Sequence, residues 1–247
     1  MSEETATGQV AGSTNGFGQP VGEQVPWTPK TAREEAPELA GRYVTLRPMT
    51  RADTPQLWSA LVEASPASLW TYLFSGPFER SAAGRQAFAA YVDSIVANDA
   101  MIPFALIVGG KAVGHACLMR DDPTMGVIEV GNIAYGAALQ RTTAATEMIY
   151  LLASYVFGDL GYRRLEWKCD SLNEPSRRAA ARFGFAYEGR FRQAVVYKGR
   201  NRDTDWFAMI DRDWPRIEEA YLAWLAPENF DETGVQRTPL AVPLPGA

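Results

Sequence analysis

The chain has 247 residues, of which 47% are hydrophobic and 21% are charged, a composition typical of globular proteins that excludes a disordered or fibrous one. Residues 1–40 hold six acidic and two basic side chains, and residues 226–247 hold three acidic and one basic. The stretch between them therefore carries a net charge of only +1, although the whole chain carries −5. A large nucleic-acid-binding face is not expected from this distribution.

Cysteine and histidine are scarce, with Cys117, Cys169 and His115 as their sole representatives. This excludes a disulfide scaffold and a zinc site built from four cysteines or several histidines, so we expect no metal. The N-terminus has no basic start and no apolar run, and no stretch reaches the ~18 apolar residues of a membrane span. We expect a cytoplasmic protein with reduced thiols and no membrane contact.

Three regions follow one another along the chain. Residues 1–40 are rich in Gly, Ser, Thr, Glu and Pro, and we expect a disordered or draped arm that Trp27 pins to the remainder. Residues 41–225 are expected to form one domain. Residues 226–247 end in a Pro-rich run and are expected to be an extended tail.

Strand-like and helix-like patterns alternate within residues 41–225. The first predicted helix begins at Asp53, which we expect to be its cap. The predicted strands are 43–48, 104–108, 112–118, 127–135, 164–169, 185–187, 193–198 and 205–210. The other predicted helices cover 88–95, 142–158, 174–183 and 214–225. This order predicts a mixed α/β sheet, with a parallel pair possible where the strand before residue 140 meets the strand after residue 163.

The strand over 127–135 leads through a short loop into a helix that begins near Thr142. The free N–H groups and the positive end of that helix suit a phosphate or pyrophosphate, and Arg141 adds a charge beside it. The alternative is an ordinary capped helix with a solvated arginine. The segment lacks the glycine and lysine positions of a Walker loop and the pattern of a dinucleotide-binding loop.

A second segment has Asn173 after a strand, where it can cap the next helix. Pro175 is favourable in the first turn of that helix, and Ser176 lies one turn in. A capped helix that ends at Gly184 would explain most of this pattern without any ligand.

Together with the opening Val44-Thr45-Leu46-Arg47-Pro48, the two segments are similar in order and spacing to the GNAT superfamily of acyl-CoA-dependent N-acyltransferases. The closest resemblance is to the branch of the ribosomal-protein N-terminal (alanine) acetyltransferases, over residues 43–225. It implies a mixed, mostly antiparallel twisted sheet with one central parallel strand pair, flanked by helices. It also implies acetyl-CoA as co-substrate, an amine acceptor and no metal.

The resemblance implies that the backbone of 140–146 holds the CoA pyrophosphate. It also implies that 132–135 pairs with the pantetheine amides and that one N–H of this strand polarises the thioester carbonyl. Thr143 replaces the central glycine of the superfamily pattern and adds a β-carbon where phosphate approaches. The implied CoA contacts are Asn132, Ile133, Ala134, Gln140, Arg141, Thr142, Thr143, Ala144, Ala145, Thr146, Asn173 and Ser176.

Ser176 is the candidate acid, or hydrogen-bond donor, for the departing CoA sulfur. Glu129 is the candidate base, because it is a lone carboxylate in an apolar strand just before the CoA-pairing segment. Its alternative is a solvated charge on an edge strand. The aromatic residues Trp70, Tyr72 and Phe74 lie where this superfamily builds its acceptor pocket, although core packing would also explain them.

Three further expectations concern function and assembly. The leading function is acetyl transfer to a primary amine of a small molecule or a peptide N-terminus; the alternatives are a larger acyl group such as succinyl, or a non-catalytic CoA-binding or regulatory module.

A homodimer is possible, because Trp214, Tyr221 and Trp224 give the last helix a large apolar surface. A cysteine nucleophile is not expected, because the side chains of His115 and Cys117 should point apart.

Overall fold

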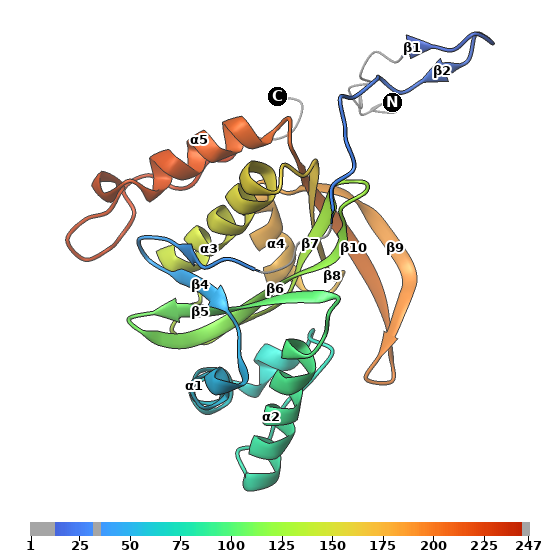
Figure 1. Cartoon of the computed structure of the whole chain (residues 1–247). Coiled ribbons are helices and arrows are strands. Elements are labelled where there is room, and N and C mark those ends of the chain that lie inside the picture. The colour runs from blue at the N-terminus through green and yellow to red at the C-terminus, as the bar shows by residue number, and fades with distance from the viewer. Residues whose placement is uncertain (1–12, 32–35, 244–247) are drawn as a thin grey trace, which may run out of the picture.

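An eight-stranded sheet runs through the protein in the order β3-β4-β5-β6-β7-β8-β10-β9 (Figure 1). Its strands are β3 (Leu39–Ala40), β4 (Thr45–Pro48), β5 (Met101–Val108), β6 (Lys111–Asp122), β7 (Val127–Tyr135), β8 (Arg164–Asp170), β9 (Ala186–Tyr197) and β10 (Arg200–Ile210). The computed structural model describes residues 13–31 and 36–243. Neighbouring strands are antiparallel except for β7 and β8, which are parallel. The predicted sheet with one central parallel pair is confirmed.

Helices cover both faces of the sheet (Figure 1). The helices α3 (Thr143–Ser154), α4 (Glu174–Arg182) and α5 (Trp214–Leu225) lie on one side, which we call the α3 face. The helices α1 (Thr54–Trp58) and α2 (Ala82–Val96) lie on the other, the α2 face. Alternation along β6 supplies both cores: Ala116 and Leu118 face α3, whereas Cys117 between them faces α2.

Short helical turns complete the chain between these elements. The 3₁₀ turns are Arg51–Asp53, Ala67–Trp70 and Pro227–Asn229, and single π-helical turns extend α1 over Ser59–Glu63 and α3 over Tyr155–Asp159.

Described residues of the N-terminal arm contact the domain at several places: Glu23 pairs with Arg212, the Lys30 N–H donates to the Pro123 carbonyl at 2.9 Å, and β3 pairs with β4. Its strands β1 (Ser13–Thr14) and β2 (Pro20–Val21) pair only with each other and lie away from the sheet (Figure 1). The indole of Trp27 donates to the Thr124 carbonyl at 2.8 Å, beside the turn between β6 and β7. The arm therefore lies against the domain at Trp27, while residues 1–12 and 32–35 of the expected disordered arm lie outside the described residues.

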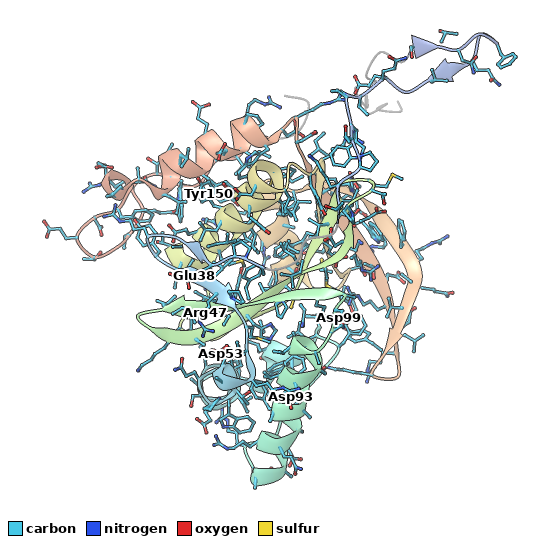
Figure 2. All side chains as sticks on the ribbon, in the orientation of Figure 1. Glu38, Arg47, Asp53, Asp93, Asp99 and Tyr150 are labelled. Atoms are coloured by element: carbon cyan, nitrogen blue, oxygen red, sulfur yellow. The ribbon has the colours of Figure 1, made fainter. Side chains whose placement is uncertain are left out.

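Asp53 occupies the expected N-cap position of α1, but its carboxylate makes no cap hydrogen bond to that helix. It accepts instead from the Thr50 backbone N–H at 2.8 Å and pairs with the Arg47 guanidinium, which reaches it from β4 (Figure 2). Burial raises the pKa of Asp53, but the Arg47 and Thr50 hydrogen bonds outweigh it and hold the pKa below its ordinary value. Asp53 thus joins the end of β4 to the start of α1.

Two predicted strands near the C-terminus are one strand. Residues 185–187 and 193–198 were expected to be separate, but β9 continues through the polar stretch between them, where Arg190 pairs with Asp205 and Phe191 with Thr204 of β10. As the edge strand of the sheet, β9 carries outward polar side chains, which break the alternation that marks a strand in the sequence.

The C-terminal aromatic residues pack within the chain. Trp214 and Tyr221 of α5 lie 6.2 and 5.8 Å, centroid to centroid, from Tyr150 of α3, and both are buried. They therefore leave little apolar surface for a second copy of the chain, and the homodimer stays a prediction. Beyond α5 the chain is not extended throughout, because Phe230 and Gln236 form a β-bridge; the last four residues of the expected tail, 244–247, lie outside the described residues.

Within residues 13–31 and 36–243, no helix is both long and apolar enough to cross a membrane. The same residues contain no group of three or more His, Cys, Asp or Glu side chains that could bind a metal ion.

Glu147 of α3 fixes the start of the domain. Its buried carboxylate accepts three backbone hydrogen bonds, from the N–H groups of Arg42, Tyr43 and Val44, at 2.9, 2.6 and 2.9 Å. These bonds join the segment before β4 to the helix that follows β7.

We expect Glu147→Gln to lower the free energy of unfolding by about 2 kcal/mol, because its amide NH₂ would face backbone donors and leave buried N–H groups unpaired. Urea denaturation measures the loss. Glu219→Gln, on the exposed side of α5, makes the same charge change and should cost less than ~0.5 kcal/mol. Equal effects of the two variants would contradict this role for Glu147.

Candidate functional site

The parallel strands β7 and β8 pair over only four residues. Their register runs from Val127 opposite Arg164 to Val130 opposite Trp167, and there the pairing ends. Beyond this point β7 stays paired with β6 on its other side, and β8 stays paired with β10. The edges of the two strands that face each other are left open, and unpaired backbone groups in such an opening can bind an extended ligand as an added strand.

A bulge in β7 marks the point of separation. Asn132 has a positive φ of 46°, and the register between β6 and β7 shifts between His115 and Cys117. A positive φ in a residue other than glycine is costly and persists only where neighbouring side chains fix it.

A cluster of side chains on the α2 face, the Asn132 cluster, fixes this bulge. The Tyr91 hydroxyl donates to Asn132 Oδ1 at 3.2 Å and lies 3.0 Å from His115 Nε2. The amide of Asn132 contacts Cys117 Sγ at 3.8 Å. The expectation that His115 and Cys117 point apart is wrong, because residues two apart on a strand lie on the same face.

Burial controls the ionisation of this cluster. It lowers the pKa of His115 from 6.5 to about 4, although the backbone of Asn132 partly opposes the shift. It also raises the pKa of the Cys117 thiol and of the Tyr91 hydroxyl. All three side chains are therefore neutral at pH 7, and Cys117 is not an activated nucleophile.

A groove of about 1030 Å³ extends from this opening along the α3 face. Many of the predicted CoA contacts line it together, which joins the two segments that the sequence singled out. They are Ile133, Ala134, Gln140, Arg141, Thr142, Thr143, Ala145, Thr146, Asn173 and Ser176. Asn132 and Ala144 do not line it; Asn132 lies in the cluster behind the strand, and Ala144 is buried.

The N-terminus of α3 forms part of the groove wall. Thr142 caps the helix, since its hydroxyl accepts from the Ala145 N–H at 3.3 Å, and Arg141 before it has a φ of 61°. The other N–H groups of the first helical turn have no acceptor within the helix, so they suit an anion such as a pyrophosphate. Thr146, one turn in, accepts from the Arg182 guanidinium at 3.0 Å.

Ser176 lies in the first turn of α4, where Asn173 caps the helix by accepting its backbone N–H at 3.2 Å. Its hydroxyl oxygen accepts from the Trp167 indole at 3.0 Å, which leaves the hydroxyl hydrogen to be donated elsewhere. One acceptor is nearby: the pKa of the Cys169 thiol is raised by burial and partly lowered again by a hydrogen bond with Ser176. No pattern in the sequence indicates Trp167 as the residue that orients this hydroxyl.

Glu129 does not line the groove. Its buried carboxylate lies on the α2 face, 2.8 Å from Lys168 Nζ and 3.0 Å from Arg120 Nε, and Lys168 also contacts Glu166 at 2.7 Å. A β-carbon at Gly131 would lie 3.1 Å from Glu129 Oε1, so this carboxylate is adjacent to the backbone just before the bulge. Burial raises its pKa, and the two cations oppose that shift.

The predicted acceptor residues are divided among three environments. Tyr72 lines the groove, and its hydroxyl donates to the Leu172 carbonyl at 3.0 Å. Trp70 is buried in the core of the α2 face, 5.5 Å from Tyr91 between ring centroids. Phe74 is 63% exposed and packs on Tyr197 at the end of β9, so the loop before α2 contacts the hairpin of β9 and β10.

The comparisons with known proteins agree with this geometry. A family model described as an acetyltransferase (GNAT) domain matches residues 44–186. A GCN5-related N-acetyltransferase from Brucella melitensis is 45% identical, with 87% of this chain and 96% of that chain covered and a TM-score of 0.82. Functionally curated sequences give no match.

Two further solved structures are similar. A protein of the GNAT family from Chromobacterium violaceum is 36% identical over 80% of this chain and 99% of its own, with a TM-score of 0.69. RimJ from Mycobacterium smegmatis, solved in complex with CoA-disulfide, is 19% identical over 73% of this chain and 88% of its own. Its TM-score of 0.60 shows a likeness of fold.

The Asn132 cluster can be tested through the one histidine of the chain. The folded pKa of His115 lies below its unfolded value, so the unfolded state binds more protons between pH 6.5 and 4. The stability that comes from a neutral His115 is complete above pH 6.5 and is lost as the pH falls toward 4, by ~3 kcal/mol in all. We expect the unfolding free energy of His115→Gln to fall less steeply than that of the wild type across this window.

Nitrogen-15 NMR gives an independent measurement, because only one imidazole contributes. Its resonances should remain those of a neutral ring from pH 8 down to about pH 5. Titration near pH 6.5 would show that the ring is accessible and would contradict the cluster.

Proposed function

Because this chain belongs to the GNAT acetyltransferase family, we propose that it transfers an acetyl group from acetyl-CoA to a primary amine by direct attack in a ternary complex. The observation that carries the proposal is the single groove that joins the opening between β7 and β8 to the N-terminus of α3. An extended acyl-CoA needs both of these features, open strand edges for its amides and free N–H groups for its phosphates. The CoA ligand of the Mycobacterium smegmatis RimJ structure supports this choice.

We place the pantetheine arm along Ile133 and Ala134, with Asn173 on its other side, and the pyrophosphate at the N–H groups of residues 142–146. The β-carbon of Thr143 does not close the groove, since Thr143 is one of its lining residues. A backbone N–H of β7 after the bulge would donate to the thioester oxygen, where negative charge develops during attack. The Asn132 cluster would hold that N–H in position.

Proton transfers then fall to two side chains. The acceptor nitrogen bonds to the acetyl carbon and the C–S bond breaks, so one proton must leave the nitrogen and the sulfur must gain a hydrogen bond or a proton. Glu129 would take the proton through water, because its raised pKa makes it a stronger base than an exposed carboxylate. Ser176 would donate to the sulfur, since the Trp167 indole already donates to its oxygen and its hydrogen can turn from the Cys169 thiol to the CoA sulfur.

The acceptor is proposed to be a small molecule or a peptide N-terminus that carries apolar or planar groups beside its amine. Tyr72 would contact it in the groove, Phe74 would lie at its outer edge, and Trp70 would support both from the core. The similarity to the ribosomal-protein N-terminal acetyltransferases favours a peptide. A succinyl donor would require a cation for its second carboxylate, so acetyl is proposed as the acyl group.

Compartment and assembly belong to the same proposal. Cys117 and Cys169 are both free and buried, which supports a reducing compartment such as the cytoplasm. A homodimer is proposed on the family resemblance alone, because related domains often pair through their late strands, and a monomeric mass by light scattering at micromolar protein would refute it.

Release of free thiol from acetyl-CoA, measured with a panel of primary amines and peptides, tests the function. We expect turnover with a small amine or a peptide N-terminus, and a fall in kcat of about 10- to 100-fold in Ser176→Ala with little change in the KM for acetyl-CoA. Ser59→Ala, whose hydroxyl is exposed and bonded to Glu63, should match the wild type. CoA binding without turnover on any amine would indicate a binding module, and acetylation of lysine side chains alone would contradict the proposed acceptor.

Glu129 and Glu166 offer a matched pair of variants, because both carboxylates contact Lys168, Glu129 from β7 and Glu166 from β8, the strand of Lys168 itself. We expect Glu129→Gln to lower kcat/KM for the amine about 100-fold at pH 7, because it removes the base. Glu166→Gln keeps that base and should stay within about fivefold of the wild type. Equal losses of activity in the two variants would contradict the role of Glu129 as base and would show that activity depends on the charge network around Lys168.

A further inference from the structure

A loop after α5 forms one wall of the groove. This C-terminal loop, residues 226–238, lies beyond residues 44–186, the part of the chain that matches the family model. In Figure 1 it extends from the end of α5 on the left of the view. The groove-lining residues from this region are Trp224, Phe230, Gly234, Val235 and Gln236.

Hydrogen bonds fix the conformation of the C-terminal loop. The Asn229 amide donates to the carbonyls of Trp224 and Thr238 at 2.9 and 3.1 Å, and so closes the loop across its base. At its tip, Asp231 Oδ1 accepts from the backbone N–H of Val235 at 3.0 Å. The Trp224 indole donates to Gln236 Oε1 at 2.8 Å, which ties the loop to α5. The wall is therefore formed before any ligand binds.

The part of the groove beside the C-terminal loop differs in chemistry from the opening between β7 and β8. Val235 lines the groove and remains 59% exposed, which is unusual for a large apolar side chain held by a closed loop. Arg182 lines the same groove; its guanidinium lies 5.2 Å from the Trp224 ring and bonds to Thr146 in the first turn of α3. An apolar wall and a cation thus lie next to the proposed pyrophosphate site.

The direction of the groove decides which part of the donor reaches the loop. Asn173 and Ser176 lie at the start of α4, beside the proposed acyl group. Arg182 at the other end of α4 bonds to Thr146 of α3 and lies against Trp224, which holds the C-terminal loop. An acyl-CoA that follows this order would bring its nucleotide to the C-terminal loop. The adenine ring has apolar faces and the 3′-phosphate is an anion, which match Val235 and Arg182 respectively.

We infer that the C-terminal loop is a binding wall for the adenosine 3′-phosphate end of CoA, with Val235 against the nucleoside and Arg182 near the phosphate. This inference rests on the proposed function and adds a specificity for the nucleotide part of the donor. The loop contributes nothing to the acyl transfer itself, so its effect should disappear with a donor that lacks the nucleotide.

The test compares Val235→Asp in two donors, acetyl-CoA and S-acetylpantetheine, by kcat/KM measured below saturation. The new carboxylate would put a charge against the apolar nucleoside of an anionic ligand, so we expect kcat/KM for acetyl-CoA to fall at least fivefold and that for S-acetylpantetheine to change less than twofold. Val235→Ser should give a smaller loss in the same direction. Val196→Asp, at an 80% exposed site on the outer strand β9, is the matched control and should leave both donors unchanged.

Adenosine 3′,5′-bisphosphate, the nucleotide half alone, gives a second readout. It should compete with acetyl-CoA in the wild type and require at least fivefold higher concentration in Val235→Asp. Equal losses with both donors, or no loss with acetyl-CoA, would overturn the role of the loop while the proposed function stands. Wild-type protein that binds no CoA by calorimetry would overturn the proposed function and this inference together.

Discussion

The separation of β7 from β8 after Val130 and Trp167 is the constraint on which the rest of the site depends. Had the parallel pairing continued to the ends of both strands, the backbone groups of residues 131–135 would be used inside the sheet. Because it stops, one strand edge stays available while the opposite edge of β7 remains bonded to β6. The helices α3 and α4 both follow strands that end at this opening, so their N-termini lie on its α3 face.

The two faces of the sheet contribute different things to that opening. The α3 face provides the groove, with capped helix starts at Thr142 and Asn173 and a hydroxyl oriented by Trp167. The α2 face provides the neutral Asn132 cluster behind the bulge and, beside it, the contacts of Lys168 with Glu129 and Glu166. The strand between the faces is thus held from behind by side chains that do not contact the groove.

The local features of this architecture could be predicted from the sequence. Alternating patterns located β7 and β8, and the spacing from Asn173 to Ser176 identified the start of α4, because each of these signals is contained in a few consecutive residues. Ten of the CoA contacts that the family resemblance implied line one groove of the structure. The local patterns failed at β9, where pairing with β10 outweighs them. At Asp53 they located the N-cap position but not the bonds of its carboxylate, which go to Arg47 and Thr50.

Long-range contacts could not be predicted in this way. Lys168 reaches Glu129 from a strand 39 residues away, and Tyr91 reaches Asn132 from a helix 41 residues away, with no periodicity linking either pair. The C-terminal loop lines the groove although its sequence is typical of a polar tail. The position of His115 and Cys117 on one face of β6 was predictable from the period of a strand.

Amide NMR of the deuterated protein during a titration with CoA tests the central claim most directly, because it reports on each backbone N–H separately. The account predicts that the N–H resonances of Ile133, Ala134 and Tyr135 and of residues 142–146 shift together with one dissociation constant. Those of α2 and of the outer strand β9 should move little. Shifts confined to the outside of this groove, or none at saturating CoA, would contradict the claim that the opening between β7 and β8 is where the donor binds.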